Sequence, residues 1–326
     1  MRALVTGATG FIGSHIVDTL LARKYDVRVL LRRTSSLEWL KDLPVEFVYG
    51  DIFSTDALRQ AVTGVDYVYH SAGLTKAKTA EIYLRANAEG TRNLLEAVKS
   101  HAPGIKRFVH ISSQAAVGPS PGAASVDENT EPAPLTSYGR SKWKAEQECH
   151  RFFGEFPVTI LRPPAVFGPR DRDIFEFFHT VARGLQPMVG FSEKYLSLIH
   201  ARDLVRGFVT AGESPKAVGE TYFITSNRYY GWKEIGDLTA RIMGKRVIRV
   251  RIPEFGVFAI AAVAEGLAKF SPKPALVNFE KARDMVQEYW TCDHHKALRD
   301  LGFEQEMTLE QGLQDTIDWY RRMGWL

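Results

Sequence analysis

The stretch TGATGFIG, residues 6–13, decides the fold of this chain. It follows the short apolar run RALVT and precedes a segment of helical periodicity that starts at about Phe11. Gly7, Gly10 and Gly13 suit a tight turn, close backbone approach to a pyrophosphate, and close packing of helix on strand, because each excludes a Cβ atom. The following helix N-terminus offers unpaired amides and partial positive charge. The stretch therefore predicts a strand–turn–helix unit that binds a dinucleotide.

Short runs rich in Val, Ile and Leu alternate with helix-length segments through the first half of the chain. This alternation favours an α/β fold with a parallel sheet covered on both faces. Because crossovers between parallel strands are right-handed, the sheet is predicted to be doubly wound, of the Rossmann type. The predicted strands cover residues 2–6, 26–31, 45–50, 65–70, 106–112 and 158–163.

The strand–helix rhythm breaks after about residue 165, where proline, aromatic residues and mixed helices follow. We therefore predict a dinucleotide-binding Rossmann domain over residues 1–166, to which residues 195–223 return. A smaller, discontinuous C-terminal substrate lobe is predicted over residues 167–194 and 224–326, ending in an amphipathic helix.

Composition excludes several classes of protein. The 326 residues are 45% hydrophobic and 25% charged, with a net charge of +4 and both signs interspersed, which disfavours nucleic acid as a partner. No run reaches the ~18 apolar residues of an integral membrane span. The apolar run at residues 255–264 is interpreted mainly as a buried core helix, with a pocket wall or a membrane-surface contact as the alternatives.

The cysteines indicate a reducing compartment. Cys149 and Cys292 lie far apart and lack metal-type spacing, so we expect free thiols, no metal ion and a cytoplasmic protein. No signal peptide is expected, because the first predicted strand starts at Arg2 and leads directly into the glycine loop.

A tyrosine and a lysine with helical spacing form the main catalytic candidate. Tyr138 and Lys142 share one helix face, and a lysine cation beside a phenol lowers the phenol pKa, so the pair could move a proton. Ser113, at a strand end upstream, could hold a substrate oxygen by a hydrogen bond. A second pair with this spacing, Tyr229 and Lys233, has no such serine and is interpreted as a structural feature.

Together these motifs resemble the extended short-chain dehydrogenase/reductase family, which includes sugar-nucleotide epimerases and dehydratases. Several motifs in the right order are more specific than any one, and the match covers nearly the whole chain. Besides the glycine loop, the motifs are GDI (50–52), HSAG (70–73), NAEGTRNLLEA (87–97), ISSQAAVG, YGRSK, RPPAVFGPRDR and IHARDL.

The resemblance implies that Ser113, Tyr138 and Lys142 are catalytic, and that Asp51 and Ile52 flank the adenine of the cofactor. It also implies that HSAG and the backbone after Arg162 lie along the cofactor. The full set of predicted cofactor contacts is Gly7, Thr9, Gly10, Phe11, Ile12, Arg32, Asp51, Ile52, Ser71, Ala72, Gly73, Tyr138, Lys142, Pro163 and Val166.

Three further polar residues receive weaker assignments. Asn87 resembles the family asparagine that supports the region of the active-site lysine, and a helix N-cap is the alternative for it. His200 and Asp203 are interpreted as structural.

Local sequence distinguishes the branches of the family. Dehydratases carry an acid pair just after the catalytic serine or threonine position, whereas Ser113 is followed by Gln114 and Ala115. Sugar-nucleotide epimerases commonly carry an Arg-Asp-Phe-like run where this chain has Ser197 and Leu198. The chain therefore resembles the dihydroflavonol reductase and 3β-hydroxysteroid dehydrogenase branch more closely.

The end of the second predicted strand points to the cofactor. Chains that bind NAD place an acid there, on the adenosine ribose, but this chain has Leu31 followed by Arg32 and Arg33. A guanidinium group matches phosphate oxygens. We therefore predict that Arg32 binds the 2′-phosphate of NADP, with NAD the less favoured cofactor.

The resulting hypothesis is an NADP-dependent oxidoreductase that transfers a hydride to or from a keto or secondary hydroxyl group of a fairly apolar small molecule. Tyr138 is its acid–base residue. The alternatives are a nucleotide-sugar epimerase that retains NAD and a non-catalytic dinucleotide sensor. A homodimer through the outer helices of the sheet is implied by the resemblance alone.

Overall fold

Seven parallel strands form the central sheet of the chain, whose computed structural model describes residues 1–268 and 278–326. The strand order is β10-β6-β5-β4-β1-β2-β3, so the winding direction reverses between β1 and β4 and the predicted doubly wound α/β fold is confirmed. The strands are β1 (Arg2–Thr6), β2 (Asp26–Leu31), β3 (Val45–Tyr49), β4 (Tyr67–His70), β5 (Arg107–Ile111), β6 (Val158–Arg162) and β10 (Glu220–Phe223).

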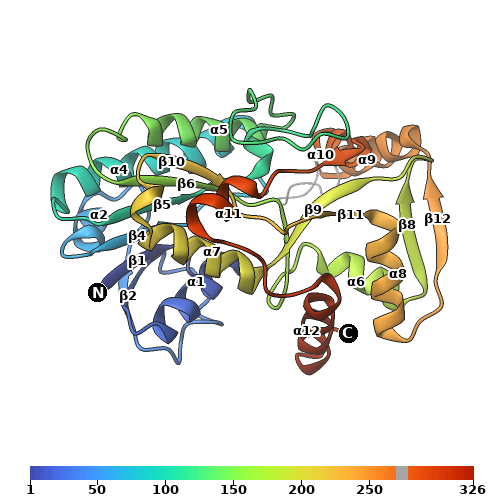
Figure 1. The fold of residues 1–326 in the computed structure, drawn as a ribbon, viewed down its shortest axis with the longest axis horizontal. Coiled ribbons are helices and arrows are strands. Elements are labelled where there is room, and N and C mark those ends of the chain that lie inside the picture. The colour runs from blue at the N-terminus through green and yellow to red at the C-terminus, as the bar shows by residue number, and fades with distance from the viewer. Residues whose placement is uncertain (269–277) are drawn as a thin grey trace.

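Helices cover both faces of this sheet (Figure 1). On one face, Val5 packs in a cluster with side chains such as Ile16 and Phe208; on the other, Leu4 packs with Leu94 and its neighbours. Burial on both faces explains why the strands have nearly continuous apolar sequences. The first face carries α1 (Phe11–Ala22) and α7 (Ala201–Glu213); the second carries α2 (Thr55–Val62), α4 (Gly90–His101) and α5 (Ser137–His150).

The glycine loop packs too tightly for larger residues. Gly7 has a φ of +73°, and a Cβ on it would lie 2.7 Å from the amide nitrogen of Ala72. A Cβ on Gly13 would lie 2.1 Å from the carbonyl oxygen of Gly7. These close approaches bring α1 directly onto the end of β1, as the sequence predicts.

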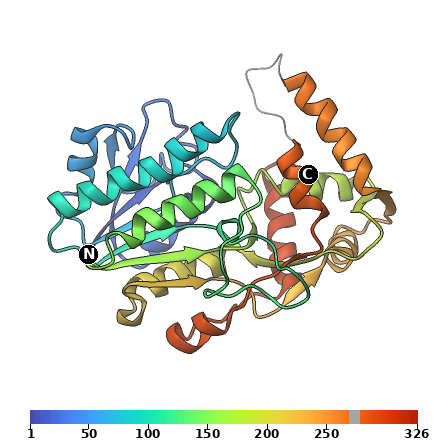
Figure 2. The ribbon, with the colours of Figure 1, turned by 90° about the horizontal axis from the view of Figure 1, so that it is seen from above.

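The second half of the chain adds a smaller group of strands and helices (Figure 2). Their core includes Phe178, Tyr230, Ile317 and Tyr320. One sheet contains β7 (Ala165–Phe167), β9 (Tyr195–His200), β11 (Tyr229–Gly231) and β13 (Tyr289–Trp290), and a separate ribbon pairs β8 (Leu185–Val189) with β12 (Ile248–Ile252). The helices are α6 (Phe175–Ala182), α8 (Trp232–Met243), α9 (Glu254–Ala268), α10 (Phe279–Val286), α11 (His295–Leu301) and α12 (Leu309–Arg322).

Residues 195–223, which the sequence assigns to the Rossmann domain, contact both sheets. Strand β9 pairs with β7, β11 and β13, whereas α7 packs on the large sheet and β10 joins it beside β6. The exact division into two domains remains a prediction. Short connecting elements are α3 (Ala80–Leu84), a π-helix (Arg85–Glu89) and two 3₁₀ helices (Gln114–Ala116 and Pro215–Ala217).

The apolar run at residues 255–264 lies in α9, and its interpretation as a buried core helix is wrong. Within α9 only Val257 and Ala261 are buried, whereas the side chain of Phe255 is 78% exposed. Among the described residues, no helix is both long and apolar enough to cross a membrane.

We predict that Gly13→Ala destabilises the fold. The new Cβ would overlap the backbone of Gly7, and overpacking of this kind costs about 1–3 kcal/mol. Gly266→Ala is the matched control, because Gly266 also lies inside a helix but has open space around its Cβ position. Denaturant unfolding of the two variants would test this. A Gly13→Ala protein as stable as the control would show that the loop can relax.

Candidate functional site

The predicted site residues follow the carboxyl ends of neighbouring strands in the large sheet. In open α/β sheets, ligands bind along this edge, near the point where the strand order reverses. That point lies between β1 and β4. Across the sheet, the residues are Pro163 after β6, Ser113 after β5, Ser71, Ala72 and Gly73 after β4, Gly7 to Ile12 after β1, Arg32 after β2, and Asp51 and Ile52 after β3.

The N-terminus of α1 has features that fit an anionic dinucleotide. Gly10 is its N-cap, no side chain caps the first turn, and no acid lies within that turn. Gly10 is exposed, and Thr9, Phe11 and Ile12 are half-buried. The amides and partial positive charge of this 12-residue helix therefore remain available to a pyrophosphate group.

The two arginines after β2 have different surroundings. The guanidinium of Arg33 lies over the ring of Tyr49, 5.3 Å from its centroid. Arg32 is exposed, and its side chain forms no hydrogen bond, ion pair or ring contact within residues 1–268 and 278–326. Glu38, an acid further along the same loop, pairs with Arg172 at 3.3 Å. Arg32 is therefore the arginine of the two that remains free for an anion.

Asn87 joins the loop after β4 to the helix that carries Tyr138. Its amide oxygen accepts a hydrogen bond from the Leu74 amide at 2.7 Å, and its amide nitrogen donates to Ser141 Oγ at 2.8 Å. Asn87 lies within the π-helix, so the alternative of a helix N-cap is wrong. Its contacts fit a supporting role for the region around Lys142.

Ser113 and Tyr138 lie together at the end of β5. Their side chains are near enough for Ser113 to affect the pKa of Tyr138, and both residues are half-buried. Ser113 also caps the following 3₁₀ helix, with its Oγ 3.2 Å from the Ala115 amide. The pair thus places two hydroxyl groups at the carboxyl edge of the sheet.

The pKa of Tyr138 differs from the sequence-based expectation that Lys142 lowers it. Burial raises the pKa of Tyr138, the hydrogen bond with Ser113 opposes that rise, and Tyr83 adds to it. Lys142 is instead buried with its Nζ donating to the Ile111 carbonyl at 2.7 Å. Burial lowers the pKa of Lys142 to about 8, while the nearby Glu146 acts in the opposite direction.

A buried ion pair below Lys142 is the feature that sequence reasoning missed. Arg162 Nη2 lies 2.7 Å from one carboxylate oxygen of Glu146, and its Nε lies 3.1 Å from the other. The Ser112 hydroxyl donates to the same carboxylate at 2.5 Å. Glu146 follows Lys142 by four residues, as Lys142 follows Tyr138, so helical spacing alone could have identified it.

The remaining predicted cofactor contacts lie in loops or strand ends. The Asp51 carboxylate accepts a hydrogen bond from the Phe53 amide at 2.8 Å, and Ile52 packs against Gly90. The Pro163 carbonyl accepts from the Gln114 amide at 2.8 Å, and Val166 lies in β7.

The residues given structural interpretations make structural contacts. Lys233 Nζ pairs with Asp237 at 2.7 Å, while Tyr229 lies in β11 and is 40% exposed. His200 caps α7 and lies 3.4 Å from Asp315. The Asp203 carboxylate accepts hydrogen bonds from the backbone amides at residues 306 and 307.

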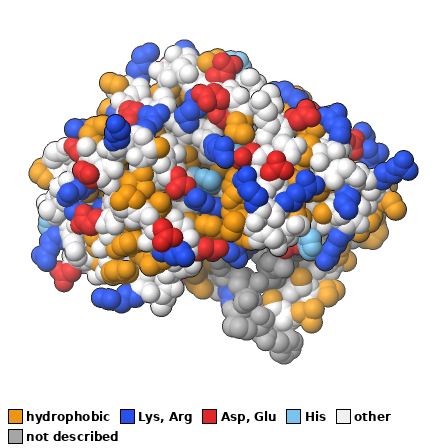
Figure 3. Space-filling view, turned by 90° about the horizontal axis from the view of Figure 1, so that it is seen from below, with side chains coloured by type: hydrophobic (Ala, Val, Ile, Leu, Met, Phe, Trp, Pro, Cys, Tyr) orange, Lys and Arg blue, Asp and Glu red, His pale blue; other side chains and the backbone are white. Residues whose placement is uncertain are grey.

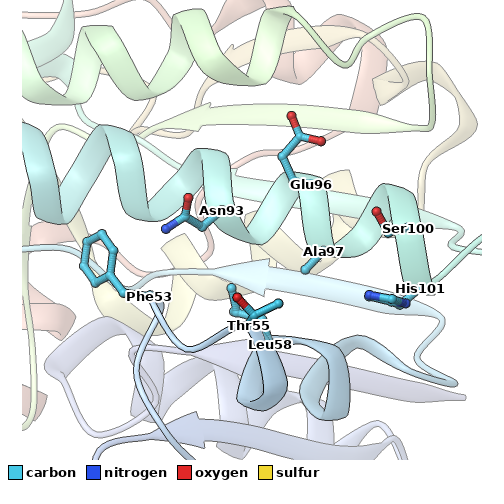
Figure 4. Close-up of a pocket in the computed structure, with 8 residues that line it drawn as sticks. All are labelled: Phe53, Thr55, Leu58, Asn93, Glu96, Ala97, Ser100 and His101. Carbon is cyan, nitrogen blue, oxygen red and sulfur yellow. The ribbon is translucent and has the colours of Figure 1, made fainter.

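Two surface hollows lie away from the predicted catalytic residues. One, of about 270 Å³, is lined by Phe53, by Thr55 and Leu58 of α2, and by residues of α4 from Asn93 to His101 (Figure 4). A second, of about 350 Å³, lies along α1 beside Arg170. Neither is lined by Ser113, Tyr138 or Lys142, so the chemistry is assigned from the strand ends and not from these hollows.

Among residues 1–268 and 278–326, one group of side chains could hold a metal ion. Asp293, His294 and His295 can bring three ligand atoms within 4.8 Å of one another. The Asp293 carboxylate already accepts a hydrogen bond from the His295 amide at 2.6 Å and contacts its Nδ1 at 2.9 Å.

Comparison with known proteins adds independent evidence. The model of the NAD dependent epimerase/dehydratase family matches residues 3–225. The ceramide reductase of Caulobacter vibrioides is 31% identical, over 99% of this chain and 95% of that protein. The 3-beta-hydroxysteroid dehydrogenase of Mycolicibacterium neoaurum is 28% identical, over 98% and 91%. The structure of a UDP-glucose 4-epimerase with UDP-glucose from Thermotoga maritima has a TM-score of 0.81 at 25% identity and 99% coverage of both chains.

The lowered pKa of Lys142 predicts a pH dependence of stability. An unfolded lysine has a pKa of about 10.4, so between pH 8 and that value the unfolded chain binds more protons than the folded chain. The contribution of Lys142 to the free energy of unfolding therefore rises with pH in that window. Below pH 8 the buried lysine is protonated, and its desolvated charge destabilises the folded state. From pH 7 to pH 10, wild type should gain about 2–3 kcal/mol relative to Lys142→Met in denaturant unfolding.

The control for this measurement is Lys144→Met, because Lys144 is exposed on the same helix. The difference between wild type and Lys144→Met should stay nearly constant over the same pH range. A constant difference for Lys142→Met as well would mean that Lys142 titrates as an ordinary surface lysine.

Proposed function

The chain belongs to the NAD dependent epimerase/dehydratase family and is an oxidoreductase of the extended short-chain dehydrogenase/reductase type. From this premise we propose that it uses NADP to interconvert a ketone and a secondary alcohol on a lipophilic small molecule. The family uses NAD or NADP and acts on small molecules. The observation that carries the proposal is that Ser113 and Tyr138 lie together at the end of β5, with Lys142 one helical turn away.

The bound nicotinamide would supply or accept the hydride. Tyr138 donates its hydroxyl proton to the carbonyl oxygen during reduction and takes the proton back during oxidation. Ser113, which lies beside Tyr138, holds that oxygen and polarises the carbonyl.

Lys142 has an electrostatic role in this proposal. With a pKa of about 8, Lys142 is protonated in most molecules at pH 7, and its cation lies one helical turn from Tyr138. Although Lys142 does not lower the pKa of Tyr138 in the protein without its ligands, a cation at this distance would favour the phenolate that Tyr138 becomes after proton donation. The carboxylate of Glu146 keeps the lysine cation tolerable in its buried position.

The names of the relatives support a lipophilic substrate. One is a ceramide reductase and another is a hydroxysteroid dehydrogenase, and each aligns over more than nine tenths of both chains. Gln114 and Ala115 stand where dehydratases carry acids, which further supports simple oxidation and reduction.

Charge at the end of β2 supports NADP over NAD. Arg32 is exposed with a free guanidinium, and no acid lies in the segment 31–37 that could accept hydrogen bonds from the ribose hydroxyls. A carboxylate at this place would repel a 2′-phosphate, whereas a guanidinium attracts it.

We expect the protein to reduce at least one ketone from a panel of steroid, long-chain acyl and aromatic ketones with NADPH. Tyr138→Phe should lower turnover by roughly 10² to 10⁴, because it removes the proton donor and keeps the ring. Tyr229→Phe is the matched control and should leave turnover nearly unchanged, because Tyr229 lies in β11 at the surface. NADPH oxidation and product analysis are the measurements.

A different result would favour the epimerase. If the purified protein retains NAD, interconverts a nucleotide sugar and accepts none of the ketones, the proposed reaction is wrong. A large loss in Tyr229→Phe with full activity in Tyr138→Phe would transfer the catalytic role to the other pair.

For the cofactor, we expect Arg32→Ala to weaken NADPH binding by roughly ten- to a hundredfold and to leave NADH binding nearly unchanged. The range corresponds to the loss of one charge-assisted hydrogen bond, worth about 1.5–3 kcal/mol. Arg33→Ala should have a smaller effect, since Arg33 is engaged with Tyr49. Fluorescence titration with both cofactors would measure this. Equal losses for both cofactors, or a wild type that prefers NADH, would argue against NADP.

A further inference from the structure

Helix α9 is apolar apart from Glu254 and Glu265, and yet it lies at the surface. Its inner side packs through Val257 and Ala261, whereas Phe255, Val263 and Leu267, spaced four or eight residues apart on the outer side, are 78%, 64% and 68% exposed. A helix with no polar face is normally buried in a core or in lipid. Figure 2 shows α9 along the outer edge of the smaller group of elements, away from the large sheet.

Neighbouring side chains extend this surface. Phe191, which follows β8, is 76% exposed, and Arg251 next to α9 donates a hydrogen bond to its carbonyl. Phe279 of α10 is 42% exposed and stacks near Phe258 of α9. We call Phe191, Phe255, Ile260, Val263, Leu267 and Phe279 the apolar rim. Hydrophobic side chains are visible at that edge of the molecule in Figure 3, as they are on other parts of the face shown.

The chain shortly before α9 is basic. Residues 245–251 contain four basic residues and no acid, and all four are exposed. Arg249 pairs with Asp237 of α8 at 2.6 Å, whereas Lys245, Arg246 and Arg251 have no acidic partner among the described residues. The two acids of α9 are engaged: Glu254 pairs with Lys194 at 3.3 Å, and Glu265 accepts a hydrogen bond from the Phe279 amide. Helix α9 itself lacks the polar face of an amphipathic interfacial helix, but the exposed apolar side chains and the nearby basic residues together fit the interface of an anionic bilayer, with apolar groups at the acyl boundary and basic groups among the headgroups.

The same pattern disfavours a second copy of the chain as the occupant. A twofold contact through the rim would bring two copies of the basic segment 245–251 toward each other. The outer side of α9 also offers no side-chain hydrogen-bonding group, which lipid does not require.

The apolar rim is connected to the candidate site. Helix α10 packs on α9 through Ala282, and its Glu280 accepts hydrogen bonds from the amide and hydroxyl of Ser137 at 2.9 and 2.8 Å. Ser137 directly precedes Tyr138. The exposed apolar surface and the proposed catalytic tyrosine are thus joined through a single short helix.

We propose that the apolar rim and the basic segment 245–251 form a membrane-docking surface. The protein lies on the surface of an anionic bilayer, with the outer side of α9 at the boundary between headgroups and acyl chains and the basic side chains among the headgroups. This proposal rests on the proposed function and extends it. The lipophilic substrate is dissolved in the bilayer and enters the site beside α10.

The test is co-sedimentation of the full chain with vesicles of phosphatidylcholine, with and without phosphatidylglycerol. Wild type should bind the anionic vesicles more strongly, and added salt should weaken that binding. The double variant Val263→Glu/Leu267→Glu should lose roughly tenfold or more of the vesicle binding. Val218→Glu is the matched control, since Val218 is an exposed apolar residue outside the rim, and it should bind as wild type does.

The docking proposal would be overturned if wild type did not sediment with vesicles, or if the double variant bound vesicles as strongly as wild type. The proposal would also fail if wild type did not bind vesicles but formed a concentration-dependent dimer that the double variant cannot form. In that case a second copy of the chain would cover the rim. If vesicle binding behaves as expected but no ketone is reduced, docking stands and the proposed reaction fails. A lipid ketone supplied in vesicles should be turned over more slowly by the double variant than by wild type.

Discussion

The buried ion pair between Glu146 and Arg162 holds the candidate site together. It connects α5 to the end of β6, and the Ser112 hydroxyl on the same carboxylate adds the end of β5. Removing one partner of such a pair leaves a buried charge without compensation, which typically costs 3–5 kcal/mol. Because Tyr138 and Lys142 occupy the two preceding turns of α5, the pair also fixes their height above the sheet. The positions of Tyr138 and Lys142 therefore depend on the Glu146–Arg162 ion pair, which is not itself part of the proposed proton transfer.

A second polar connection runs under the glycine loop. Thr6 Oγ1 lies 2.7 Å from Nδ1 of His70, whose Nε2 lies 2.8 Å from Thr91 Oγ1. Thr91 in turn donates to the backbone carbonyl of Asn87. Burial lowers the pKa of His70 to about 3, so the ring is neutral and can act as donor on one side and acceptor on the other. The strand that precedes the dinucleotide loop and the asparagine beside α5 are thus parts of one hydrogen-bonded frame.

Local pattern was sufficient for much of this arrangement. The glycine spacing, the apolar strands and the helical spacing of Tyr138 and Lys142 each arise from backbone geometry, which neighbouring residues determine. Properties set by burial could not be derived in the same way. The pKa of Tyr138 is raised because the protein removes water from it, and α9 is exposed despite a sequence that resembles a core helix. Asn87 was assigned to the correct region, but its place in a π-helix depends on packing against the loop after β4. The site residues themselves remain predictions of role, although their common location is structural fact.

The contact of Glu280 with the start of α5 bears on how enzymes of this kind diversify. The proposed acid–base groups and the dinucleotide loop all lie within the first 166 residues, whereas Glu280 and the apolar surface next to it come from later in the chain. Mutations can therefore reshape the wall that selects a substrate while the proton-transfer groups stay in place. Arg140 also pairs with Glu280 at 2.7 Å, so this polar junction requires residues from both parts of the chain. Substrate specificity can therefore change through the later part of the chain while the proton-transfer groups stay the same, provided that Glu280 keeps its contacts with Ser137 and Arg140.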